Sequence, residues 1–230
     1  MLTENTIIGI ALVATLIMAL SLHEMAHATV AYWRGDDTAK KLGRITLNPI
    51  KSIDPVLSIL VPGLLFFVLP RLLGTPPILF GGAKPVPVIP SRLHHPHRDM
   101  MWVALAGPAT NFVLAFLSMV CLKGLLVTGT VERSDMVARI LMGSVQFNIL
   151  LTVFNLLPIP PLDGSRAMTY ALPEKLRGPY LALTPFGFPI IIAIVFFIPG
   201  GQEVLFRWMN GTYDWLAGVV EALFDMFNAR

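Results

Sequence analysis

The chain has 230 residues, of which 55% are hydrophobic and 13% are charged, and its mean hydropathy is +0.70. Charged residues this sparse cannot cover the surface of a soluble domain of this length, so the composition predicts an integral membrane protein. The net charge is +3. Because the basic residues do not cluster with aromatic ones on one face, we expect no nucleic-acid partner.

The first predicted element is one helix over residues 6–33, which carries no charged residue until an HExxH motif formed by His23, Glu24 and His27. No small-residue cleavage site closes the apolar run, so we interpret it as a membrane anchor that is not removed as a signal peptide. The motif follows the apolar run directly, and we therefore expect it at membrane depth.

The HExxH spacing predicts a metal site. Residues four apart on a helix lie on one face about one turn apart, so the imidazoles of His23 and His27 can bind a single zinc ion. The carboxylate of Glu24 then flanks the metal and can take a proton from a zinc-bound water, whose pKa the metal lowers toward about 7. A chance match is disfavoured, because two imidazoles and a carboxylate are costly inside a membrane.

The loops predict the orientation of the chain in the cell membrane. Basic residues exceed acidic ones over residues 34–51, so this loop is expected in the cytoplasm and the amino terminus outside. At 1.5 Å per residue, His23 lies roughly 25 Å along the helix from Thr6, against a hydrocarbon core of about 30 Å. We therefore expect the active site toward the cytoplasmic side of a multi-pass membrane protein.

The next apolar stretch, residues 53–82, is interrupted by prolines at positions 55, 62, 70, 76 and 77. The loop that follows, residues 84–98, is again basic, so the stretch must enter the membrane and return if both basic loops face the cytoplasm. We predict a re-entrant or broken hairpin here. Helix-breaking residues at depth are tolerated where protein or a water-filled cavity satisfies the freed backbone groups.

Three further apolar runs are predicted over residues 100–127, 136–157 and 180–198. The loop between the first two fits the outside, and the basic loop before the third fits the cytoplasm. Apolar residues in the tail, residues 201–230, recur at helical spacing and favour an interfacial amphipathic helix over a last span. The predicted fold is an all-α polytopic membrane protein with about four to six transmembrane helices and short extended segments, in which residues 1–200 form a single domain.

The sequence must also supply a third zinc ligand, because a catalytic zinc usually has three protein ligands and one open position. No third histidine of the metzincin type follows His27. The strongest candidate is Asp163, which follows a group of prolines after the run over residues 136–157 and is expected at the depth of His23. A helix cap is the alternative interpretation of Asp163.

At these residues a family resemblance becomes clear. The HExxH motif in the first helix, together with NLLPIPPLDG over residues 155–164, resembles the site-2 protease family of intramembrane zinc metalloproteases. The similarity covers about residues 20–170 in the family's order, and its further motifs lie at residues 43–49, 54–55, 83–88 and 106–111. The chain is most similar to the compact prokaryotic form with neither a PDZ nor a CBS domain.

The resemblance implies that His23, His27 and Asp163 bind one zinc ion per chain and that Glu24 is the general base. It also implies a role for Asn155, which falls where the family has an asparagine that holds extended substrate or its developing oxyanion. An amide donor near the metal suits that role, because a peptide carbonyl acquires negative charge in the tetrahedral state.

The resemblance further implies a substrate-binding segment at Lys84, Pro85, Val86, Pro87 and Val88, where the family has extended chain that pairs with substrate. Pro85 and Pro87 have no N–H to donate, so any strand here is an edge strand.

Other polar residues have simpler interpretations. His94, His95 and His97 could form a second metal cluster, but their short basic loop favours a solvated interfacial segment. Asn111 and Asn148 lie within predicted helices, where we interpret them as bonding between helices. Gly107 is interpreted in the same way, as a helix-packing position.

The function expected from these observations is that of a zinc endopeptidase that hydrolyses peptide bonds within or near the transmembrane segments of membrane-protein substrates. Its partners would be those substrates and the lipid bilayer. A metal-binding or transport protein could use the same ligands, but this alternative leaves Glu24 and Asn155 without a task. An inactive scaffold is disfavoured, because all four expected metal-site residues are present.

Overall fold

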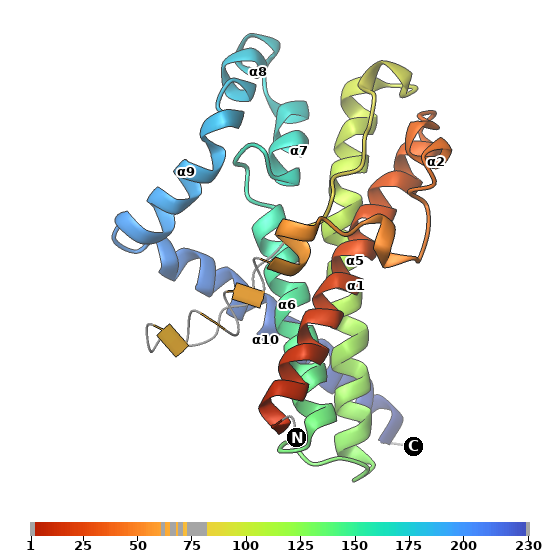
Figure 1. The fold of residues 1–230 in the computed structure, drawn as a ribbon, viewed down its shortest axis with the longest axis vertical. Coiled ribbons are helices and arrows are strands. Elements are labelled where there is room, and N and C mark those ends of the chain that lie inside the picture. The colour runs from red at the N-terminus through yellow and green to blue at the C-terminus, as the bar shows by residue number, and fades with distance from the viewer. Residues whose placement is uncertain (1–2, 61–62, 65–67, 69–70, 73–81, 229–230) are drawn as a thin grey trace.

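The computed structural model describes residues 3–60, 63–64, 68, 71–72 and 82–228. Its centre consists of α1 (Glu4–Trp33), α5 (Pro96–Val127) and α6 (Met136–Asn155), which pack against one another (Figure 1). Within the described residues, these three helices are long and apolar enough to cross a membrane. No strand occurs in this part of the chain, and the predicted all-α membrane fold is confirmed.

The remaining elements are short, with one exception at the carboxyl end. They are α2 (Thr38–Lys41), 3-10 turns at Pro49–Lys51, Pro90–Arg92 and Thr184–Phe186, π-helical turns at Pro55–Leu60 and Ala193–Phe197, α7 (Asp163–Ala171), α8 (Glu174–Leu181), α9 (Gly187–Ile192) and the long α10 (Gly201–Asn228).

Helix α1 begins where the hydroxyl of Thr3 accepts a hydrogen bond from the Thr6 N–H, which satisfies one of the free donors of the first turn. One face of α1 packs against Leu151 of α6, through a cluster that includes Leu16 and Leu20. Ile7 and Ile10 are exposed on its outer side. A helix that is apolar on all sides suits a membrane, where the outer face meets lipid.

Helix α10 packs across α5 and α6. Leu216 and Val220 are buried in a cluster with Met119 of α5 and Ile149 of α6. Trp215 of α10 is exposed on the outer side of this contact. The amphipathic character predicted for the tail is therefore present, and α10 is not among the three helices that could span a membrane. Its interfacial position stays a prediction.

The apolar run over residues 180–198 was predicted as one passage, and the structure divides it instead. It contains the end of α8, a 3-10 turn, α9 and a π-helical turn. Pro185 and Pro189 fall within it, and each lacks the N–H that a continuous helix would need. Prolines therefore break this run into short pieces.

The predicted hairpin over residues 53–82 is described only near its two ends. The Ser58 hydroxyl donates to the Gly82 carbonyl at 2.6 Å, and the Lys84 N–H donates to the Ser52 carbonyl at 2.9 Å. The two ends of the stretch therefore lie side by side, as a returning hairpin requires. Most of the intervening chain, including residues 73–81, lies outside the described residues.

Candidate metal centre

The two histidines of the HExxH motif lie on one face of α1, and both are buried. The Nε2 atoms of His23 and His27 are 3.0 Å apart, as the i, i+4 spacing predicts. Two imidazole nitrogens at this distance leave no room for another atom on the line between them, so their lone pairs repel unless a proton or a cation is shared.

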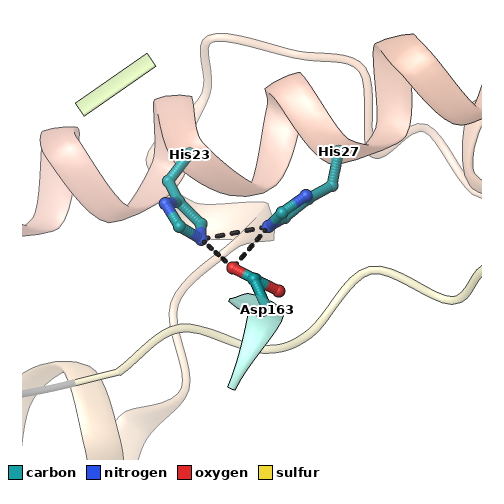
Figure 2. Close-up of side chains that lie close together, drawn as sticks. All are labelled: His23, His27 and Asp163. Atoms are coloured by element: carbon teal, nitrogen blue, oxygen red, sulfur yellow. Dashed lines mark hydrogen bonds and ion pairs between the residues drawn. The ribbon is translucent and has the colours of Figure 1, made fainter. Parts of the chain in front are cut away.

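Asp163 completes the group from a distant part of the sequence. Its Oδ2 atom lies 3.1 Å from Nε2 of His23 and 3.2 Å from Nε2 of His27, and the three side chains point toward one another (Figure 2). Asp163 is the first residue of α7, and Leu162 occupies the cap position before it. The cap position thus belongs to another residue, and the Asp163 carboxylate is directed at the two imidazoles.

The donor set fits zinc. Zinc binds imidazole nitrogen and carboxylate oxygen at about 2.0–2.2 Å, so ligand atoms around one tetrahedral ion lie about 3.3 Å apart. The three separations found here are close to that value. Among the described residues, His23, His27 and Asp163 are the one group of three or more His, Cys, Asp or Glu placed to hold a metal ion.

Hydrogen bonds to the far side of each ring determine which nitrogen faces the metal. His23 Nδ1 lies 2.5 Å from Oδ1 of Asn111, and His27 Nδ1 lies 2.6 Å from the carbonyl oxygen of Val103. Because both partners accept, each Nδ1 carries the proton and each Nε2 offers its lone pair to the centre. Helix α5 therefore orients both histidines of α1.

The amide of Asn111 is itself held in place. Its Nδ2 donates to Oδ1 of Asn148 on α6 at 2.9 Å, and Nδ2 of Asn148 donates to the Ser144 carbonyl at 2.9 Å. All three residues are buried. The chain of donors keeps the Asn111 oxygen directed at His23. Asn111 and Asn148 thus bond between helices as interpreted, and they also orient a proposed ligand.

Gly107 allows α5 to approach the site closely. A Cβ atom at this position would lie 2.5 Å from Nε2 of both His23 and His27, well inside contact distance. The absence of a side chain therefore leaves the space in which the ligand nitrogens stand. Gly107 is thus a packing position, as interpreted, and the side chains that pack against it are the two predicted histidine ligands.

Glu24 lies between the two histidines on α1 and is half-buried. Its Oε2 atom accepts a hydrogen bond of 2.9 Å from the N–H of Val86. The side chain of Val86 is buried in a cluster with Ala28 and Ala39. The segment predicted to bind substrate, residues 84–88, thus passes beside the predicted base, although it forms no strand with any described residue.

The segment over residues 84–88 is anchored at both ends. Arg44 donates a hydrogen bond to the Lys84 carbonyl. At the far end, Oδ2 of the fully buried Asp36 accepts from the Ile89 N–H at 2.6 Å. Burial raises the pKa of Asp36, but hydrogen bonds from Thr38 and Ile89 outweigh it and hold that pKa below its usual value. Asp36 therefore stays ionised at neutral pH and holds the segment.

The side chain of Asn155 makes its hydrogen bond within its own helix and not with the predicted metal ligands. It is the last residue of α6, and its Nδ2 donates to the Leu151 carbonyl of the same helix at 2.9 Å. No hydrogen bond among the described residues joins it to the three predicted ligands. Its substrate role therefore stays a prediction.

His94 and His95 precede α5 and His97 lies in its first turn, and none of the three belongs to the candidate metal group found among the described residues. His94, His95 and His97 are exposed, as expected for a solvated segment. Asp99, in the first turn of α5, is fully buried and accepts from the His95 N–H at 2.7 Å. The His95 backbone and the start of α5 are thus joined through the Asp99 carboxylate.

Replacing Asn111 with leucine should weaken zinc binding by about 10- to 100-fold, because His23 would lose the acceptor that orients it. The affinity is measured by chelator competition on the purified protein. Thr152→Val is the control, since Thr152 is buried on α6 and its hydroxyl bonds to the backbone carbonyls of Asn148 at 2.7 Å and Pro108 at 3.3 Å, so the side chains that hold the Asn111 amide keep their partners. Equal zinc affinities in the two variants would contradict the assigned role.

Several named proteins are similar to this chain in sequence. It is 38% identical over 223 residues to "Putative zinc metalloprotease YwhC" of Bacillus subtilis, covering 93% of this chain and 92% of that protein. It is 31% identical over 212 residues to "Putative zinc metalloprotease Rip2" of Mycolicibacterium smegmatis, covering 90% of this chain and 72% of that protein. The Rip2 protein of Mycobacterium tuberculosis is 33% identical to the chain over 226 residues, covering 93% of this chain and 73% of that protein. No family model and no solved structure matches the chain.

Proposed function

The chain belongs to the family of zinc metalloproteases that includes YwhC and Rip2, and on that premise we propose that it is an intramembrane endopeptidase of the site-2 protease type. Zinc is its cofactor, and membrane-spanning helices form its centre. The observation that carries the proposal is the convergence of His23, His27 and Asp163 beside α5, with two of the three on a candidate span.

The depth of the site supports cleavage inside the membrane. His23 lies 19 residues beyond the start of α1 at Glu4, which corresponds to about 28 Å along the helix axis. A hydrocarbon core is about 30 Å thick. By the positive-inside rule, the basic loop that follows α1 favours a cytoplasmic position for this end of the helix. We therefore place the site near the cytoplasmic face of the cell membrane, with the amino terminus outside.

The proposed chemistry divides between the metal and the chain. When bound, zinc supplies an activated water and polarises the scissile carbonyl. The Val86 N–H occupies Oε2 of Glu24, so the other carboxylate oxygen is left to take a proton from the water and return it to the leaving amine. One hydrogen of the Asn155 amide bonds to the Leu151 carbonyl, and its second hydrogen is the one proposed to donate to the developing oxyanion.

The substrate must be extended at the cleaved bond. A helix hides its carbonyls in its own hydrogen bonds, so a transmembrane substrate has to unwind locally before the base and the metal can reach it. The segment over residues 84–88 lies against Glu24 and could receive the unwound chain. Pro85 and Pro87 offer only carbonyl acceptors to a partner strand. The proposed partners are therefore transmembrane proteins whose helices can open.

The test is cleavage of a model transmembrane substrate by the purified protein, with the product ends mapped by mass spectrometry. We expect cleavage within the hydrophobic segment, loss of cleavage with a chelator, and recovery with zinc. A pair of helix-breaking substitutions near the cleaved bond should speed cleavage, because local unwinding becomes easier. The same pair placed at the far end of the substrate helix is the control. Cleavage confined to soluble segments, or no faster with the breaking pair, would contradict the proposal.

A further inference from the structure

A cavity of about 940 Å³ lies at the end of the helical bundle away from the metal centre. It is enclosed by the first turns of α1, the last turns of α5, the first half of α6 and the middle of α10. Ile8 of α1 lines it, and His23 stands 15 residues further along the same helix, about 22 Å away. The cavity is therefore separate from the proposed active site, and its volume is in the range of small-molecule sites.

The inner wall of the cavity is apolar. Leu12, Met119, Leu122, Phe147 and Val220 contribute to it from four different helices. Such a wall suits the hydrocarbon part of a ligand. A hydrocarbon placed against it does not cover any polar group of the wall and so removes no hydrogen bond.

The outer part of the cavity is cationic. Four basic side chains line it, from residues 71, 123, 133 and 139, against one acidic side chain, that of Glu221. Lys123 donates to Glu221 at 2.9 Å, and Arg139 pairs with Glu4 at 3.1 Å. No ion pair with another described residue engages Arg133, so its guanidinium remains available to an anion at the opening.

We propose that this cavity binds one anionic phospholipid, with its phosphate at Arg133 and Lys123 and its acyl chains along the apolar wall. An amphiphile matches both halves of the cavity, and the cavity lies at the ends of the three candidate membrane-spanning helices, where lipid headgroups are expected. An extended peptide fits less well, because the described residues that line the cavity lie mostly on helices and include no strand edge with which a peptide could pair.

The lipid would also join α10 to the rest of the protein. Tyr213, Ala217 and Val220 of α10 line the cavity opposite Ile8 and Leu12 of α1. A ligand that fills this space contacts both helices at once and binds only the folded arrangement. Binding should therefore raise the temperature of unfolding.

The experiment uses the full chain purified in a neutral detergent, to which phosphatidylglycerol or phosphatidylcholine with the same acyl chains is added. Native mass spectrometry counts bound lipid, and thermal unfolding reports stabilisation. We expect one phosphatidylglycerol to bind saturably and to raise the unfolding temperature, with phosphatidylcholine much weaker. Arg133→Gln should weaken phosphatidylglycerol binding about tenfold, the effect of losing one charge-assisted contact. Lys175→Gln removes an exposed charge on α8, far from the cavity, and should change nothing.

A second pair of variants tests the cavity without altering charge. Ala217→Trp fills the space and should abolish binding, whereas Ala222→Trp, on an exposed part of α10 outside the lining, should not. Equal binding of the two lipids, equal effects of Arg133→Gln and Lys175→Gln, or unchanged binding to Ala217→Trp would each overturn the proposal. So would an equal stabilisation by glycerol phosphate, since that anion does not need the apolar wall.

Discussion

Replacing Glu24 with glutamine should abolish peptide-bond cleavage while the protein keeps one zinc ion per chain. Glutamine has the same shape and its amide oxygen can still accept from the Val86 N–H, so the surroundings of the site are retained. An amide cannot take a proton from water, however. General bases typically contribute 10²- to 10⁴-fold to a rate, so cleavage of the model substrate should fall by at least about 100-fold. Zinc content is measured on the same preparation.

The control for this variant is Glu203→Gln, which makes the same chemical change at an exposed position of α10. It should leave both cleavage and zinc content at the values of the unchanged protein. Full cleavage by Glu24→Gln would remove Glu24 from the proposed mechanism. Zinc in every preparation with cleavage in none, across several substrates, would favour the metal-binding or transport alternative.

Replacing Gly107 with alanine should remove zinc and activity together, although alanine is the better helix former by about 1 kcal/mol. The added Cβ would lie 2.5 Å from Nε2 of both His23 and His27, and these rings cannot move aside without leaving Asn111 and the Val103 carbonyl. We expect zinc affinity to fall at least tenfold, within the range found for losing the partners that orient ligands.

The matched control lies on the same helix. A Cβ at Gly124 would meet Phe224 at 3.6 Å, which is an ordinary contact, so Gly124→Ala should retain zinc affinity and cleavage. Chelator competition and circular dichroism on both variants separate metal loss from unfolding. If Gly107→Ala binds zinc as tightly as Gly124→Ala, the close approach of α5 to the site is not as tight as the structure shows.

The candidate metal centre could be predicted in part from the sequence, because its strongest signal is local. The spacing of His23 and His27 is read directly from helical geometry, and the structure brings both to one point. Asp163 was the harder case. Its place after the prolines indicated a turn back at the right depth, and the structure puts it within 3.2 Å of both histidines. The sequence alone left open whether the Asp163 carboxylate binds a metal or caps a helix, because its position is consistent with both roles.

The residues that orient the histidines were out of reach of sequence reasoning. Asn111 and Gly107 both carried packing interpretations, and neither has a local pattern that points to His23. Their roles depend on the register of α5 against α1, which is decided by side-chain packing along two long apolar helices. The same limit applies to the tail of the chain and to the broken run over residues 180–198. In that run, the prolines predict where a helix ends, but they do not predict the direction in which the chain continues.

The proposed ligands come from elements that are 140 residues apart in the chain, one on α1 and the other at the start of α7. A bound ion would therefore act as a crosslink that closes a very long loop. Closing a loop of this length removes much of the conformational entropy of the unfolded chain. Because an ion that binds only the folded chain also stabilises it by mass action, zinc would hold the α6–α7 connection against α1 as well as serve the reaction. The metal-free protein is then expected to be a looser molecule at this connection, so the supply of zinc would regulate its lifetime in the cell as well as its activity.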